Sequence, residues 1–191
     1  FNIAANALDN VGKGLRFEAT DAAAQVNGLA SELARVNLQL NRTAAGTSDQ
    51  TMLLDQRDQL MQQLSGLADI ATTIGADQTV EVRIGGAPLV QGGSAKAFAM
   101  ATAGDGTISF TLDGAPVTVS SGSLAGKALA LVAVRDNRTA LDDIADKLVT
   151  AANGAQTAGA ALDGSAGQPL FSGSGAGGIA LALTSGSQLA T

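Results

Sequence analysis

The sequence lacks cysteine, histidine, tryptophan and tyrosine, and its 191 residues include only five phenylalanines. Without cysteine there is no disulfide framework, thiolate nucleophile or soft metal ligand. Without histidine the commonest general base and imidazole metal ligand are missing, which excludes Ser-His-Asp and Cys-His catalysis. An enzyme would have to depend on carboxylates, Lys, Arg or Ser alone. We therefore expect no catalytic residue, no metal site, no cofactor and no enzymatic activity.

Basic residues are also scarce, with 11 Lys and Arg against 17 Asp and Glu and a net charge of −6. A phosphate backbone would mostly be repelled, and few aromatic rings are present to stack on bases. No window approaches the roughly 20 consecutive apolar residues of a membrane span, and no secretory signal pattern is visible. We expect neither nucleic acid nor a membrane as partner. The chain opens on FNIAANALDN, without Met and already in helical rhythm, so we interpret it as a fragment.

Two interleaved seven-residue series predict a long first helix with coiled-coil-like packing. The series consist of Leu8, Leu15, Ala22, Leu29 and Val36, and of Gly12, Ala19, Val26, Leu33 and Leu40. Gly46 can adopt the left-handed conformation after this helix. Thr47 and Gln50 fit a capping box that opens a second helix, whose apolar seam continues to Ile74 and ends at Gly75. The short connection predicts antiparallel neighbours.

From about 76 to 121 the apolar period changes to two, in the runs TVEVRI, GTISFTL and PVTVS, with KAFAMAT as a fainter strand. Asp113-Gly114 is a strong two-residue hairpin signal. A third helix is predicted from near Ser123 to about Thr157. The remainder is a Gly/Ser-rich turn region that ends in a strand-like run, IALAL.

These patterns predict a mainly helical α+β fold. We expect an elongated antiparallel bundle of three long helices, with a small antiparallel β subdomain inserted between the second and third. The helical rod domain would comprise 1–75 and 122–160, and the β subdomain 76–121. Residues 161–191 would form a Gly-rich turn and a C-terminal extended segment that packs on the rod.

Three patterns could carry chemistry, and each has a simpler interpretation. GSGAGG (173–178) satisfies G-x-G-x-x-G, but a strand-like run follows it and no acid occurs later, so we predict a flexible loop. The Asp-Gly pairs lack the spacing of a calcium loop and are typical of turns. Asp142 and Asp143 are adjacent on a helix, point in different directions and fit a solvated face better than an acid–base pair.

Arg57 interrupts the otherwise apolar seam of LLDQRDQLMQQLSGLADI (53–70), and its helical neighbours offer no acid to pair with. In an antiparallel hairpin Glu32 lies within plausible reach, and the third helix could bring Asp136 or Asp143 to the same level. We predict that Arg57 sets helix register, because a slipped register would leave its charge unpaired. The alternative places Arg57 at the rim with its head in water. Under the register hypothesis, Arg57→Leu should preserve or raise thermal stability.

Several segments together resemble the family of flagellar hook-associated protein 1, a junction protein between hook and filament. They are RFE…VNGLASELARVNLQLN, LLDQRDQLMQQLSGLADI, the Gly-rich TVEVRIGGAPLVQGG, SGSLAGKALALVAVRDN…LDDIADKLVTAAN and ALDGSAGQPLF. The resemblance covers essentially the whole chain. The order and spacing of these loose motifs carry it more than any single motif does.

The resemblance implies a structural component of the bacterial flagellum that is exported through the flagellar type III apparatus and located outside the cell. It implies self-assembly into a ring of subunits, with the hook protein and the second junction protein as further partners. In the family, terminal helices flanking this region mediate polymerisation, so the fragment is expected to be monomeric. A helical interaction module of a surface adhesin or sensor ectodomain is the alternative, and an enzyme is a distant third.

Overall fold

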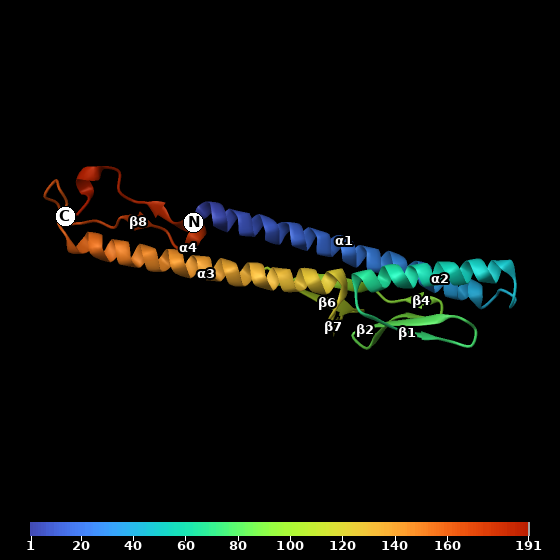
Figure 1. Cartoon of the computed structure of the whole chain (residues 1–191). Helices are drawn as coiled ribbons and strands as arrows, with labels where there is room; N and C mark the ends of the chain where they lie inside the picture. Colours follow the sequence, from blue (N-terminus) through green and yellow to red (C-terminus); the bar gives the residue numbers. More distant parts are fainter. Residues whose placement is uncertain (191) are drawn as a thin grey trace. The chain divides into compact units, whose positions relative to one another are not determined.

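The computed structural model describes residues 1–190, and three long helices dominate it (Figure 1). They are α1 (Asn2–Leu40), α2 (Ser48–Leu67) and α3 (Gly122–Ala158). All strands of the larger two sheets lie between α2 and α3 in the sequence. The predicted mainly helical α+β fold, with an antiparallel β insertion between the second and third helices, is confirmed.

The chain divides into two compact units. Unit 1 comprises Phe1–Lys13 and Ala133–Thr191, and unit 2 comprises Gly14–Val132. Thus α1 and α3 each contribute residues to both units, whereas α2 and the two larger sheets belong to unit 2 alone. These boundaries differ from the sequence-based division into rod, β subdomain and tail, whose last residue, Thr191, lies outside the described residues.

The core of unit 2 lies between the helices and two antiparallel sheets. From the companion series of α1, Ala19, Val26, Leu33 and Leu40 are all buried here, as the seven-residue repeat predicts. Leu60 and Leu64 of α2 pack in the same cluster, together with inward residues of both sheets. The two helices are therefore held together by the apolar stripe that the sequence shows, with the sheets as a second layer.

Seven strands build the two sheets, and each sheet pairs its strands in chain order. The four-stranded sheet A is β1 (Ile70–Ile74), β2 (Val80–Ile84), β3 (Ala87–Gln91) and β4 (Ser94–Ala95). The three-stranded sheet B is β5 (Phe98–Thr102), β6 (Ile108–Leu112) and β7 (Ala115–Val117). Asp113 and Gly114 join β6 to β7 with φ values of 53° and 80°, which confirms the predicted two-residue hairpin turn.

The predicted end of the second helix is wrong. Helix α2 stops at Leu67, Ala68 is extended, and residues 70–74 form β1 instead of a last helical turn. Ile70, Ala71 and Ile74 fit a helical spacing, so the apolar pattern alone could not exclude a helix. The segment is rich in β-branched residues, and pairing with β2 along its whole length decides its conformation.

Unit 1 contains the first part of α1, most of α3 and the C-terminal segment. Its short elements are β8 (Phe171–Ser172), α4 (Gly175–Gly178), β9 (Ala180–Leu181) and the 3₁₀ helix η1 (Gly186–Gln188). The predicted flexible loop at 173–178 therefore contains one helical turn, and the expected terminal strand is only two residues long. Its buried apolar cluster is small, with Ala5, Ala145 and Ala176 packed against Leu141.

Candidate functional site

Arg57 lies inside the protein, with only 6% of its surface exposed. Its Nε and Nη2 atoms donate to Oδ1 of Asp58 at 2.9 and 2.8 Å, and Nη1 donates to the backbone oxygen of Gln78 at 2.7 Å. The guanidinium head is therefore bound by protein groups and does not lie in water at the rim. Burial of this charge is compensated by one carboxylate and one carbonyl.

The contact with Gln78 connects α2 to the turn between β1 and β2. Gln78 has a φ of +64°, a left-handed conformation that is unusual for a residue with a side chain. The carbonyl that accepts from Arg57 belongs to this residue. Arg57 thus holds the turn in contact with α2. This contact explains the presence of an arginine in an otherwise apolar seam. A role in helix register stays a prediction.

The three carboxylates predicted as partners of Arg57 have other contacts. Glu32 accepts from Nε of Arg35 at 2.9 Å and from Nε2 of Gln56 at 2.7 Å, so it links α1 to α2. The bond from Arg35 lowers the pKa of Glu32 below its ordinary value. Asp136 forms an ion pair with its neighbour Arg135 at 2.8 Å.

Asp143, the third predicted partner, is exposed in the second half of α3. Arg57 takes its partners from Asp58 and Gln78 rather than from any of the three predicted carboxylates. The physical reason is the direction of the side chains on α2. Gln56 binds Glu32 of α1, whereas the next residue, Arg57, binds the turn between β1 and β2.

Helix-borne asparagines are positioning residues that the sequence reasoning missed. Asn37 is fully buried, and its amide accepts from the N–H of Val80 at 2.9 Å and donates to the oxygens of Val80 and Gly92, both at 2.8 Å. Asn27 makes the same pair of bonds to the N–H and oxygen of Phe98, both at 2.8 Å. Each side chain thus behaves like one residue of an additional strand and binds a sheet to α1.

The same device recurs in unit 1. Asn153 accepts from the N–H of Phe171 at 2.8 Å and donates to its oxygen at 2.9 Å. The buried Gln156 accepts from the N–H of Ala190 and donates to the oxygen of Gln188. In the sequence, such a residue can be recognised only as an Asn or Gln at the border of the polar face of a predicted helix. Nothing in the neighbouring sequence shows which backbone N–H and C=O groups its side chain will bind.

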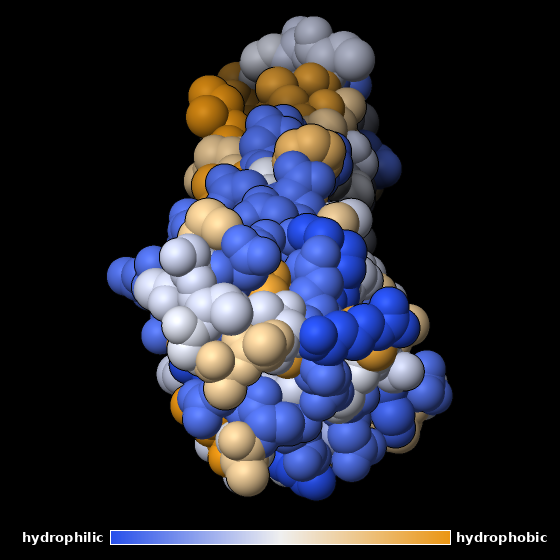
Figure 2. Space-filling model, turned by 90° about the vertical axis from the view of Figure 1, so that its right-hand side faces the viewer, coloured by the Kyte–Doolittle hydropathy of each residue, from blue (hydrophilic) through white to orange (hydrophobic). Residues whose placement is uncertain are grey.

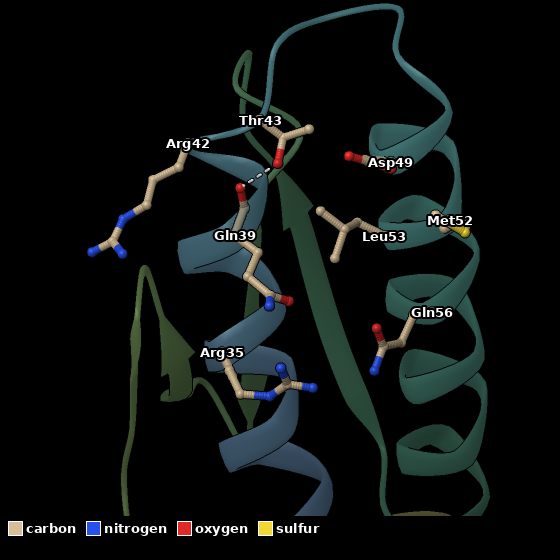
Figure 3. A pocket seen from close by; sticks show the side chains of 8 residues that line it. All are labelled: Arg35, Gln39, Arg42, Thr43, Asp49, Met52, Leu53 and Gln56. Atoms are coloured by element: carbon tan, nitrogen blue, oxygen red, sulfur yellow. Dashed lines mark hydrogen bonds between the residues drawn. The ribbon is translucent and has the colours of Figure 1, made fainter.

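A groove lies between the end of α1 and the start of α2, with a volume of about 480 Å³ (Figure 3). Its lining is Arg35, Gln39, Arg42, Thr43, Asp49, Met52, Leu53 and Gln56. Figure 3 shows Arg42 pointing away from α2, while Leu53 and Gln56 point toward α1. A single carboxylate among amides and arginines offers no acid–base pair, so this groove is suited to polar contact rather than to catalysis.

Figure 2 shows mainly hydrophilic residues on the face of the molecule turned to the viewer.

The described residues contain neither a cluster of metal ligands nor a membrane-spanning helix. Within 1–190 there is no group of three or more Asp, Glu, His or Cys side chains arranged to hold a metal ion. No helix in that part of the chain combines the length and apolar character needed to cross a membrane.

Comparison with known proteins identifies a family and a solved structure with the same architecture. The model of the family described as flagellar hook-associated protein FlgK helical domain matches residues 1–171. The chain belongs to this family. A solved structure, the flagellar hook junction protein FlgK from Burkholderia pseudomallei, is similar to it with a TM-score of 0.78 and 23% sequence identity. The match covers 90% of this chain and 33% of the Burkholderia protein, so the chain spans about a third of that FlgK. No curated protein sequence matches the chain.

Membership of the FlgK helical domain family confirms the resemblance seen in the sequence. The matched range ends at Phe171, so it includes all three long helices, both larger sheets and the ALDGSAGQPLF segment. At 23% identity the Burkholderia structure supports the fold of this FlgK-family chain and nothing finer. The insertion of sheets between α2 and α3 is thus part of a known helical domain.

Proposed function

We propose that this chain is the helical domain of a structural component of the bacterial flagellum, acting at the junction between hook and filament. The match of the FlgK helical domain over residues 1–171 carries this proposal. The architecture supports it, because long helices with continuous apolar stripes form stiff elements that can stack side by side. Such a component works by shape and contact and catalyses no reaction.

In the intact protein, we propose that this domain takes part in lateral and axial self-assembly into a ring of subunits. The hook protein and the second junction protein would be its further partners, and its location would be extracellular after export through the flagellar apparatus. A chain without cysteine suits passage in an unfolded state, since no disulfide can form on the way. The 191-residue chain alone is expected to be monomeric at micromolar concentrations.

Deletion of the parent gene, followed by electron microscopy of the cells, tests the junction role. We expect hooks without filaments and filament protein released into the medium. Complementation with the intact gene should restore filaments. Complementation with a gene lacking the codons for 14–132 should not restore them, even when the shortened protein is detected outside the cell. Normal filaments in the deletion strain would refute the proposed function.

A further inference from the structure

Most sheet edges in unit 2 are protected against pairing with another strand. The outer side of β5 is occupied at Phe98 by the amide of Asn27. Strand β4 is only two residues long, and β7 is three residues long and contains Pro116, which cannot donate to a ladder. The remaining edge strand, β1, has five residues, IATTI, with no charge, no proline and no bulge in its pairing with β2.

The free edge of β1 presents unpaired backbone groups. Antiparallel neighbours alternate between residues that bond the partner strand and residues that point away from it. Gly75 donates to the oxygen of Thr79 at 2.8 Å, in the same register that pairs β1 with β2. By alternation, Ile70, Thr72 and Ile74 direct their N–H and C=O groups outward. Residues 71–74 are exposed, and 50% of the surface of Ile74 is accessible.

The sequence of β1 is nearly symmetric about Thr72, which indicates what this edge fits. We propose that β1 pairs antiparallel with β1 of a second copy of this chain, with Thr72 opposite Thr72 of the copy. Ile70 then lies opposite Ile74 of the copy on both sides of the centre. These three residue pairs are all of the bonded kind, at two hydrogen bonds each, so up to about six backbone hydrogen bonds can form. The two four-stranded sheets become one continuous sheet.

Charges near the edge permit this register. In the symmetric pairing Asp69, the acid next to β1, lies opposite Gly75 of the copy, so the two copies bring no like charges together there. On the neighbouring strand, Arg83 and Glu81 form an ion pair within the chain at 2.6 Å. The contact surface consists of Ile, Ala and Thr side chains, which favour a strand of the same β-branched character.

A five-residue pairing is small compared with interfaces that hold permanent dimers. We expect the chain to be monomeric at micromolar concentration and to associate measurably only at hundreds of micromolar. The two-fold arrangement reverses one copy relative to the other, whereas subunits of a ring all point the same way. This interface is therefore separate from the proposed ring contacts, and its failure would leave the junction function untouched.

Sedimentation equilibrium of the 191-residue chain from 10 µM to 1 mM tests the proposal. Thr72→Pro removes an outward N–H without breaking the β1–β2 ladder, so it should weaken association by about tenfold, since two bonds of the dimer are lost. Thr72→Lys places like charges opposite each other and should weaken association several-fold. Thr73→Lys, the matched control, adds the same charge one residue away, where it faces Ala71 of the copy, and should change little. Circular dichroism checks that each variant is folded.

Mixing variants tests the register directly. Thr72→Lys and Thr72→Glu should each associate poorly alone, because position 72 faces itself. An equal mixture should recover association, because opposite charges then face each other. In amide exchange, Thr72 and Ile74 should become protected as the concentration rises. An absence of association up to 1 mM would overturn the proposal, as would association that the substitutions at Thr72 do not alter or that mixing does not restore.

Discussion

At the scale of single residues, a few buried or half-buried polar side chains connect the helices to the sheets. Arg57 binds a β turn, and Asn27 and Asn37 bind strands to α1. Asn37 satisfies the backbone groups of Val80, which would otherwise be buried without partners, whereas the Gln78 oxygen bound by Arg57 belongs to an exposed residue. Their contributions differ, because the groups at the far end of each contact differ in access to water.

For Arg57, we expect a small change in global stability. Arg57→Leu should keep the free energy of unfolding within about 1 kcal/mol, because Asp58 and Gln78 are exposed and water can replace the lost bonds while Leu packs in the seam. Amide exchange in the turn at 75–79 should accelerate. Urea unfolding and exchange mass spectrometry measure the two effects. A large loss of global stability would contradict this account.

For Asn37, we expect a larger effect. Asn37→Ala leaves the N–H and the carbonyl oxygen of Val80 buried without partners, whereas water can reach the oxygen of the exposed Gly92. Unfolding should therefore require about 2–4 kcal/mol less free energy. Asn10→Ala, an exposed position on the same helix, is the matched control and should stay within about 0.5 kcal/mol of the wild type. Equal losses of unfolding free energy at both positions would show that the hydrogen bonds of Asn37 do not stabilise sheet A.

At the scale of elements, the connections between helices and sheets depend on particular backbone conformations. Gly122, the first residue of α3, has a φ of +82°, and a Cβ there would lie 2.7 Å from backbone atoms of Leu67 and Ala68. This glycine lets the start of α3 lie against the end of α2. By contrast, Gly28 in α1 has open space where a Cβ would lie.

The two glycines should respond in opposite directions. Gly122→Ala should destabilise the protein by at least about 2 kcal/mol, because it combines a left-handed backbone with a steric clash. Gly28→Ala should stabilise it by about 0.5–1 kcal/mol through helix propensity. Thermal and urea unfolding of both variants provide the comparison. Stabilisation by Gly122→Ala would show that the space between Gly122 and the backbone of Leu67 and Ala68 can accommodate a methyl group.

Where the chain leaves the sheets, Asp69 accepts from the backbone N–H of Ser120 at 2.9 Å and from its hydroxyl. Partial burial acts to raise the pKa of Asp69, but the hydrogen bonds from Ser120 outweigh it and the pKa is lowered. A lowered pKa means that this contact stabilises the protein fully above the ordinary aspartate pKa and is lost as pH falls through the lower folded value. Asp69→Asn should therefore reduce the dependence of stability on pH below about 4. An unchanged acid unfolding profile would contradict this.

At the scale of the whole molecule, the two units differ in how they are stabilised. Unit 2 buries many large apolar side chains, whereas the buried cluster of unit 1 consists of three alanines and the partly buried Leu141. Unit 1 depends more on hydrogen bonds to the C-terminal segment, including those that Asp142 and Asp146 accept from backbone N–H groups of α4. Less apolar area buried means less stabilisation per residue.

We expect the units to open at different free energies. In native-state hydrogen exchange with increasing urea, amides of 133–158 should exchange at lower denaturant concentration than amides of 19–40. The difference follows from the small core of unit 1. If the amides of both segments exchange at the same urea concentration, the two units unfold together and this account is wrong.

The apolar period and the turn residues in the sequence were sufficient for three helices, for strands β2, β5, β6 and β7 and for the Asp113-Gly114 hairpin, because these signals are local. They did not predict β3, where the buried Leu89 and Val90 are adjacent and do not alternate with polar residues. The same signals failed at 70–74, where an apolar spacing fits either a helix or a strand and pairing with β2 decides. The burial of Arg57 could be raised as a question from its neighbours, but its partners could not be identified.

Only the tertiary structure decided that Arg57 binds Gln78, and likewise which backbone groups Asn27, Asn37 and Asn153 bind. Local propensity acts over a few residues, whereas these contacts join positions 18 to 71 residues apart in the sequence. Which distant groups meet depends on how the whole chain packs, and no short window of sequence contains that information.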